Sequence, residues 1–114
     1  MFTLKLLGGA CVEGPEGPLT GRVAQRRRLA VLALLAMSRR QGLGREKLAA
    51  TLWPESGGDR ARHLLSDTIY VINRALGGRD GDAVTAAAGE LRLRAGAFAC
   101  DARAFEDAVG NGAL

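Results

Sequence analysis

The stretch ARHLLSDTIYVINRALG, from Ala61 to Gly77, decides the fold that the sequence predicts. Its apolar residues recur every three or four positions, the spacing that places side chains on one face of a helix. The members of this core-facing stripe are Ala61, Leu65, Thr68, Ile69, Ile72 and Leu76. We predict that Asp59 caps the helix start by accepting first-turn amide hydrogen bonds. Gly77 is predicted to end the helix in a left-handed conformation.

The other face of this helix carries polar side chains, most of which can hydrogen-bond to phosphates or to base edges. These side chains are Arg60, Arg62, His63, Ser66, Asp67, Tyr70, Asn73 and Arg74. Taken alone, the same pattern also fits an ordinary surface helix. The flanking sequence has to decide between the two interpretations.

Composition indicates a globular chain whose charge is unevenly spread. The 114 residues are 47% hydrophobic but only 4% aromatic, so the core is expected to consist mostly of Leu, Ala and Val. The net charge is +4. Between Arg22 and Lys47 there are eight basic residues and a single acid, Glu46, which favours a polyanionic partner. Arg26, Arg27 and Arg28 oppose a helix dipole there, and fit either a solvated helix end or phosphate contacts.

Other function classes find little support in the sequence. Cys11 and Cys100 lack metal-ligand spacing, and we expect both to be reduced, buried thiols of a cytoplasmic protein. The longest apolar run, Leu29 to Met37, is too short to span a bilayer. No glycine-rich phosphate loop opens a helix, and no nucleophile, histidine and acid form a set. We therefore expect no catalytic activity, cofactor, metal or membrane contact.

The remaining elements follow from residue periodicity and turn residues. Strands are predicted at 2–6, 10–12 and 19–20, helices at 25–40 and 45–52, a hairpin from 84–86 and 91–94, and a last helix at 102–109. The fold class is thus α+β. Two helices joined by a short loop, the second with a polar face, form a helix-turn-helix-like unit, and the hairpin after them fits the wing of a winged helix.

Five segments together resemble a known family. They are RRRLAVLALLA (26–36), LGREKLAATLWPE (43–55), ARHLLSDTIYVINRALG (61–77), ELRL (90–93) and CDARAFEDAV (100–109). The pattern resembles the OmpR/PhoB-type winged helix of SARP-like regulators, which carry a bacterial transcriptional activator domain (BTAD). Its most specific marks are two short sequences. One is Leu52-Trp53-Pro54 at the end of the second helix, and the other is Asp101 followed by Phe105-Glu106, which opens the next domain in the family. The resemblance covers essentially the whole chain.

The resemblance implies a cytoplasmic transcription factor with an N-terminal antiparallel sheet, three core helices, a short strand after the first helix, and a C-terminal hairpin wing. The third helix would enter the major groove of double-stranded DNA, and the wing tip, residues 87–90, would touch the adjacent backbone or minor groove. The DNA-binding residues expected from the residues and the resemblance are Arg26, Arg27, Arg28, Trp53, Arg60, Arg62, His63, Ser66, Thr68, Tyr70, Asn73, Arg74 and Arg92. Trp53 alternatively packs in the core, Tyr70 alternatively packs on the hairpin, and His63 alternatively is an ordinary surface residue.

The resemblance also implies a division of the chain and a set of partners. Residues 1–96 would form the DNA-binding domain, and residues 97–114 a linker and the truncated start of a helical BTAD-like domain. Family members often bind direct repeats as head-to-tail dimers. RNA polymerase or the C-terminal activator domain would be protein partners.

Departures from the family pattern keep a second hypothesis open. Family members often have Arg where this chain has Val71 and Asn73, and arginine is the commonest reader of guanine. Asp67 and Glu90 place acids where phosphates would repel them. The alternative is a degenerate winged helix that acts as a protein-interaction module, with an exposed apolar patch around Ile69, Tyr70 and Val71.

Overall fold

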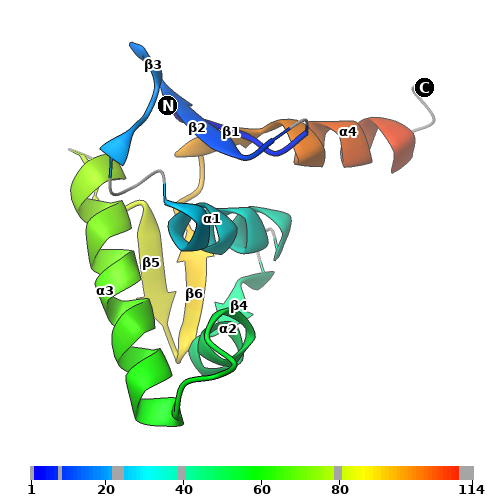
Figure 1. Ribbon diagram of the computed structural model, residues 1–114. Helices are drawn as coiled ribbons and strands as arrows, with labels where there is room; N and C mark the ends of the chain where they lie inside the picture. The colour runs from blue at the N-terminus through cyan, green and yellow to red at the C-terminus, as the bar shows by residue number, and fades with distance from the viewer. Residues whose placement is uncertain (1, 8, 22–24, 39–40, 79–80, 111–114) are drawn as a thin grey trace.

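The computed structural model describes residues 2–7, 9–21, 25–38, 41–78 and 81–110. These residues form a mixed α+β fold with four helices and two sheets (Figure 1). In chain order the elements are β1 (Phe2–Lys5), β2 (Cys11–Gly14), β3 (Gly17–Pro18), α1 (Arg26–Ser38), β4 (Leu43–Gly44), α2 (Arg45–Leu52), α3 (Gly58–Leu76), β5 (Val84–Ala87), β6 (Glu90–Leu93), β7 (Phe98–Cys100) and α4 (Asp101–Gly110).

The first sheet has the strand order β3-β2-β1-β7. β1 runs antiparallel to β2 and parallel to β7, and Leu4 lies opposite both Val12 and Cys100. The predicted N-terminal antiparallel strands are therefore joined by a strand from the segment that the sequence assigned to a linker. The third strand was predicted at residues 19–20 and lies at Gly17–Pro18, because the turn before it is short. Leu19 still donates its amide to the Val12 carbonyl at 2.8 Å.

The second sheet has the order β4-β6-β5 and contains the predicted hairpin. Ala87 lies opposite Glu90, so the hairpin turn consists of Ala88 and Gly89 alone. Both have positive φ, 53° and 81°, as a two-residue type I′ turn requires. Such turns match the right-handed twist of the strands. The short strand β4, expected after the first helix, pairs with β6.

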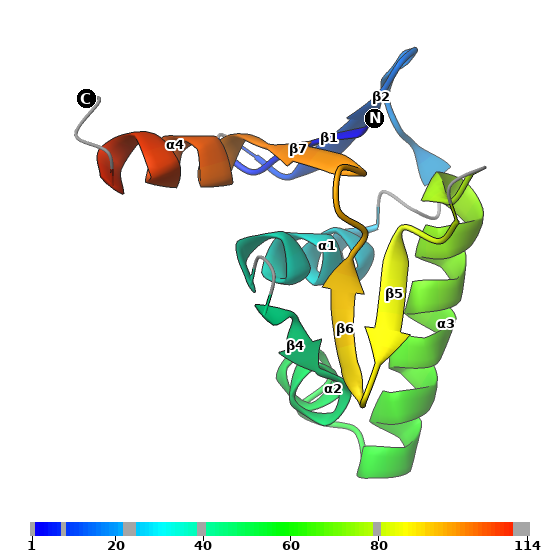
Figure 2. The same cartoon turned by 180° about the vertical axis from the view of Figure 1, so that it is seen from behind.

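Helix α1 lies between the two sheets, beneath β1 and α4 and against β6 (Figures 1 and 2). This helix is buried on more than one side, because Val31 and Leu35 are both fully buried. Leu34, one position before Leu35, is exposed, because neighbouring helical positions point in different directions. Arg39 and Arg40, its predicted end, lie outside the described residues.

Helix α2 has the predicted bounds, whereas both ends of α3 differ from prediction. The α3 N-cap is Gly57, and Asp59 lies inside the first turn, where it does not cap. Gly77 is extended, with φ −69° and ψ 154°, and its amide donates to the Asn73 carbonyl. Glycine is nevertheless required there, since a Cβ atom would overlap the carbonyl oxygen of Asn73.

The buried face of α3 is wider than the predicted stripe. Its buried residues are Ala61, Leu65, Thr68, Val71, Ile72 and Leu76. Ile69 is half-buried against the core. Helix α3 packs against α1, α2 and β5, and three neighbours bury more of a helix than one apolar stripe indicates. Of the two cysteines, both free thiols, Cys100 is buried, but Cys11 is only half-buried on β2.

Candidate nucleic-acid interface

The face of α3 that points away from the core carries a line of polar side chains, which we call the outer stripe. It consists of Arg60, His63, Asp67, Tyr70 and Arg74, spaced alternately three and four residues apart. All five residues are exposed, and Tyr70 most clearly so at 62%. Arg60 and Arg74, at its two ends, have no hydrogen-bond or ion-pair partner among the residues that the structure describes. The stripe thus presents two available guanidinium groups.

The centre of the outer stripe is a histidine–carboxylate pair. His63 Nε2 lies 3.5 Å from Asp67 Oδ2, one helical turn away. Both side chains are largely exposed, so water screens the pair and its contribution to stability is small. His63 and Asp67 therefore face each other on the outer stripe.

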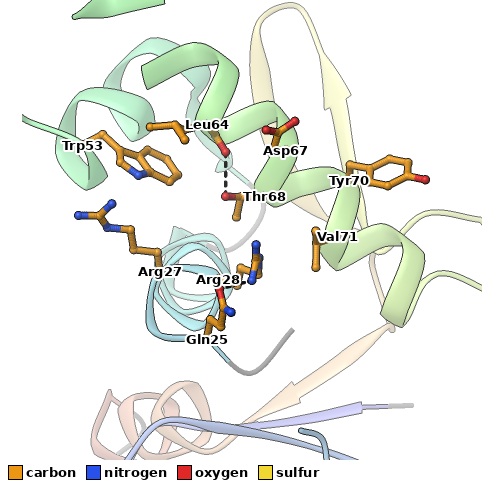
Figure 3. Close-up of a pocket in the computed structure, with 9 residues that line it drawn as sticks. All are labelled: Gln25, Arg27, Arg28, Trp53, Leu64, Asp67, Thr68, Tyr70 and Val71. Carbon is orange, nitrogen blue, oxygen red and sulfur yellow. Dashed lines mark hydrogen bonds between the residues drawn. The ribbon is translucent and has the colours of Figure 1, made fainter. Parts of the chain in front are cut away.

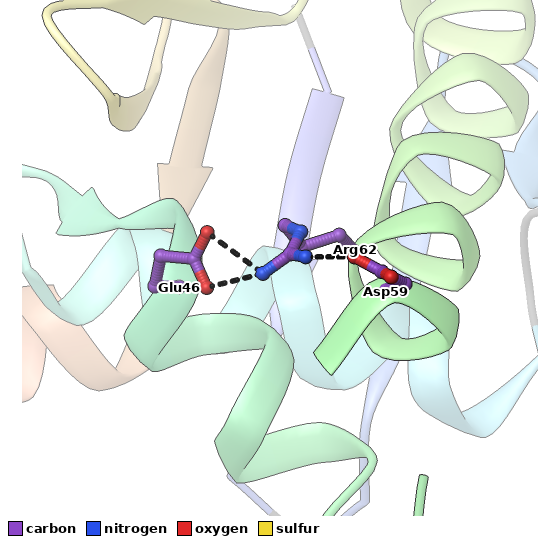
Figure 4. Close-up of polar contacts among 3 residues, drawn as sticks. All are labelled: Glu46, Asp59 and Arg62. Carbon is purple, nitrogen blue, oxygen red and sulfur yellow. Dashed lines mark hydrogen bonds and ion pairs between the residues drawn. The ribbon is translucent and has the colours of Figure 1, made fainter. Parts of the chain in front are cut away.

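Arg62, predicted to contact phosphate, instead connects α2 to α3 (Figure 4). Its Nη1 donates to both carboxylate oxygens of Glu46, at 3.2 and 3.3 Å, and its Nη2 pairs with Asp59. The Glu46 hydrogen bond, followed by that of Asp59, raises the pKa of Arg62 above its ordinary value. A phosphate would have to compete with two carboxylates for this guanidinium group.

Ser66 makes a second link between the same two helices. Its hydroxyl oxygen accepts a hydrogen bond from Arg45 Nη2 at 2.8 Å. Arg45 begins α2, and Lys47 is exposed one position beyond Glu46. Sequence reasoning did not select these two cations individually, although both fall in the basic segment 22–47.

Thr68, Val71 and Asn73 are turned inward. For Thr68 this confirms the predicted core-facing stripe and corrects the expected DNA contact, and for Asn73 it corrects the expected DNA contact. Thr68 is 5% exposed, and its hydroxyl donates to the Leu64 carbonyl at 2.8 Å. Val71 is 7% exposed and packs toward α1. The apolar patch proposed around Ile69, Tyr70 and Val71 is therefore reduced to Tyr70.

Asn73, the third of these residues, pairs with the open edge of β5. Its Nδ2 donates to the Val84 carbonyl at 3.1 Å, and its Oδ1 accepts from the Val84 amide at 2.8 Å. Among the described strands β5 is the outermost of its sheet, so none of them neighbours this side of Val84. The carboxamide supplies the donor and acceptor that such a strand would supply. Asn73 thus fastens α3 to the hairpin.

A groove separates the first turn of α1 from α3 (Figure 3). It is lined by Gln25, Arg27, Arg28, Trp53, Leu64, Asp67, Thr68, Tyr70 and Val71. Trp53 is 5% exposed, which confirms the packing alternative for this residue. The Arg27 guanidinium carbon lies 5.6 Å from the centre of its indole ring, a cation–π distance. Arg26 and Arg27 are exposed, whereas Arg28 is half-buried and donates to Gln25.

The hairpin presents less positive charge than the helices. The carbonyl of Gly89 at its tip accepts the Arg45 amide at 2.9 Å, and this satisfies an amide at the start of α2, whose N-cap residue Gly44 has no side chain. Arg92 lies on the hairpin flank with its Nη2 3.6 Å from Glu90 Oε1. The hydrogen bond from the Arg45 amide to the Gly89 carbonyl holds the hairpin tip against α2.

No protein-family model, no curated protein and no solved structure matches the chain. In the described parts of the chain, no helix has the length and apolarity needed to cross a membrane. Among those same residues, no three His, Cys, Asp or Glu side chains gather as metal ligands would.

Proposed function

We propose that this chain is the DNA-binding domain of a bacterial transcriptional regulator, a winged helix of the OmpR/PhoB type in a SARP-like, BTAD-containing protein. Helix α3 would enter the major groove. The observation that carries the proposal is the outer stripe, an exposed polar helix face with an available arginine at each end. Such a face, flanked by further cations, is suited to a polyanion with readable bases.

The arrangement around α3 supports the same proposal. Helix α2 packs on α3 through the Trp53 turn, as the first helix of a helix-turn-helix does, and the β5–β6 hairpin lies alongside α3 (Figure 1). The element order also agrees with the one implied by the family resemblance, including strand β4 between α1 and α2. The hairpin would approach the adjacent backbone through Arg92.

Cations flank the outer stripe on two sides. Arg26 and Arg27 lie across the groove at the start of α1, and Arg45 and Lys47 lie in the first turn of α2. With α3 in the major groove, both groups of cations would lie close to phosphates of the adjoining backbone. Each neutralised phosphate contributes about −0.9 to the slope of log K against log salt.

The test compares arginine variants by fluorescence anisotropy with a random-sequence duplex at several salt concentrations. Arg60→Ala and Arg74→Ala should each weaken binding to all sequences and reduce the salt slope by about 1. Lys5→Gln is the charge control, because it removes one positive charge from β1, where Lys5 pairs with Glu13. Arginine variants that bind like the Lys5→Gln control would contradict the proposal.

A second candidate function is a protein-interaction module, with RNA polymerase or an activator domain as partner. The internal neutralisation of Arg62 by Glu46 and Asp59 favours it, as does the exposure of Phe105 and Val109 on α4. It predicts no salt-dependent DNA binding, so the same titration separates the two candidates. The first candidate further proposes a cytoplasmic location and a head-to-tail dimer on direct repeats.

A further inference from the structure

The outer stripe has an acid, not an arginine, at its centre. Arg60 and Arg74 are fourteen residues apart, which corresponds to about 21 Å along a helix, whereas the major groove is roughly 12 Å wide. If α3 crosses the groove, its two end arginines reach the flanking backbones. The side chains left over the base edges are His63, Asp67 and Tyr70.

The inward-turned residues narrow the set of base readers further. Thr68 and Val71 are buried, and the Asn73 carboxamide is occupied by Val84. Of the three central side chains, Asp67 alone is an acid, and a carboxylate accepts hydrogen bonds without donating any. His63 engages its Oδ2, and Oδ1 has no partner among the described residues.

The hydrogen-bonding groups that each base presents in the major groove decide which base suits the Asp67 Oδ1 atom. Guanine presents two acceptors in the major groove and thymine presents one, and all of these repel a carboxylate. Adenine presents an amino donor beside the N7 acceptor. Cytosine presents only its N4 amino group, so it offers a carboxylate a donor without an adjacent acceptor on the same base.

We infer that Asp67 is a specificity-determining residue that accepts a hydrogen bond from the N4 amino group of a cytosine in the major groove. This inference rests on the proposed DNA-binding function. In this arrangement Asp67 lowers affinity for random DNA by repelling phosphates and gives preference for one C·G pair in return. Asp67, the acid that departs from the family pattern, thus reads a base.

The experiment is selection of bound duplexes from a random pool by wild-type protein and by Asp67→Asn and Asp67→Ala. Wild type should enrich cytosine at one position, with about tenfold weaker binding when that base is changed. Asp67→Asn should shift the preference there to adenine, whose N6 and N7 match a carboxamide. Asp67→Ala should lose preference at that position alone and bind random DNA more tightly. Glu16→Gln, an exposed acid on the β2–β3 turn, is the control and should keep the wild-type site.

The outcomes separate the inference from the function on which it rests. An enriched site that is unchanged in both Asp67 variants overturns the role of Asp67 and leaves DNA binding established. An enriched guanine opposite the centre of the helix also overturns it. If wild-type protein with a normal thermal transition binds no duplex at low salt, the proposed function fails, and the inference fails with it.

Discussion

Replacing Asn73 by alanine tests the role that the structure gives to this residue. The substitution removes both hydrogen bonds to Val84, the donor at 3.1 Å and the acceptor at 2.8 Å. Val84 is buried, so its amide and carbonyl lose their partners without gaining water. A lost hydrogen bond costs about 1 kcal/mol, and a buried group left unpaired costs about 1–3 kcal/mol.

From these values we expect Asn73→Ala to reduce the free energy of unfolding by about 2–4 kcal/mol. Domains of this size are stable by about 5–15 kcal/mol, so the effect is a substantial fraction of the total. Urea denaturation followed by circular dichroism measures it, with an expected midpoint shift of about 1–2 M.

The neighbouring substitution Arg74→Ala is the matched control, because that side chain is exposed and has no partner among the described residues. It should change the unfolding free energy by no more than about 0.5 kcal/mol. If Asn73→Ala were as stable as Arg74→Ala but altered the selected DNA sequence, Asn73 would be a base reader after all. The assignment of Asn73 to the β5 edge would then be refuted.

Three further predictions concern other contacts. Asp101→Asn should lower the melting temperature at pH 7, because the Asp101 carboxylate accepts a hydrogen bond from the Leu6 amide at 2.7 Å. This hydrogen bond is the main cause that lowers the pKa of Asp101 below its ordinary value of 3.8. A lowered carboxyl pKa contributes stability that is lost as the pH falls through the pKa of the folded state. The melting temperatures of wild type and Asp101→Asn should therefore converge below pH 3.8, and a constant difference would exclude the ionised contact. Ala88→Asn should stabilise the hairpin by about 0.5–1 kcal/mol in urea denaturation, since asparagine tolerates positive φ better, and destabilisation would contradict the turn assignment. Glu46→Gln should leave Arg62 paired with Asp59 as its one remaining carboxylate and raise affinity for random duplex roughly two- to fivefold at low salt. An equal gain in Glu16→Gln would reduce the effect to net charge.

Local patterns predicted most of the helices and the hairpin. The bounds of α2 followed from its apolar spacing and from Pro54, and the hairpin followed from alternation around Gly89. These features depend on residues close together in the chain. The same is true of the core stripe of α3, whose apolar period is visible in a short window.

Contacts between distant segments escaped prediction. Strand β7 pairs in parallel with β1, nearly the whole chain away, and no short pattern marks such a partner. The sequence also assigned to DNA binding residues of the polar face of α3 that have partners within the protein. Periodicity identified that face but could not show that Asn73 meets Val84, or that Glu46 from another helix meets Arg62.

The most direct test of the central claim is the affinity of the wild-type chain for a random-sequence duplex, measured by fluorescence anisotropy over a series of salt concentrations. The account predicts binding at low salt that weakens linearly in log–log form, with a slope of about −0.9 for each phosphate contacted. An absence of binding at low salt, or binding that does not respond to salt, would contradict the assignment of α3 and its flanking arginines to DNA.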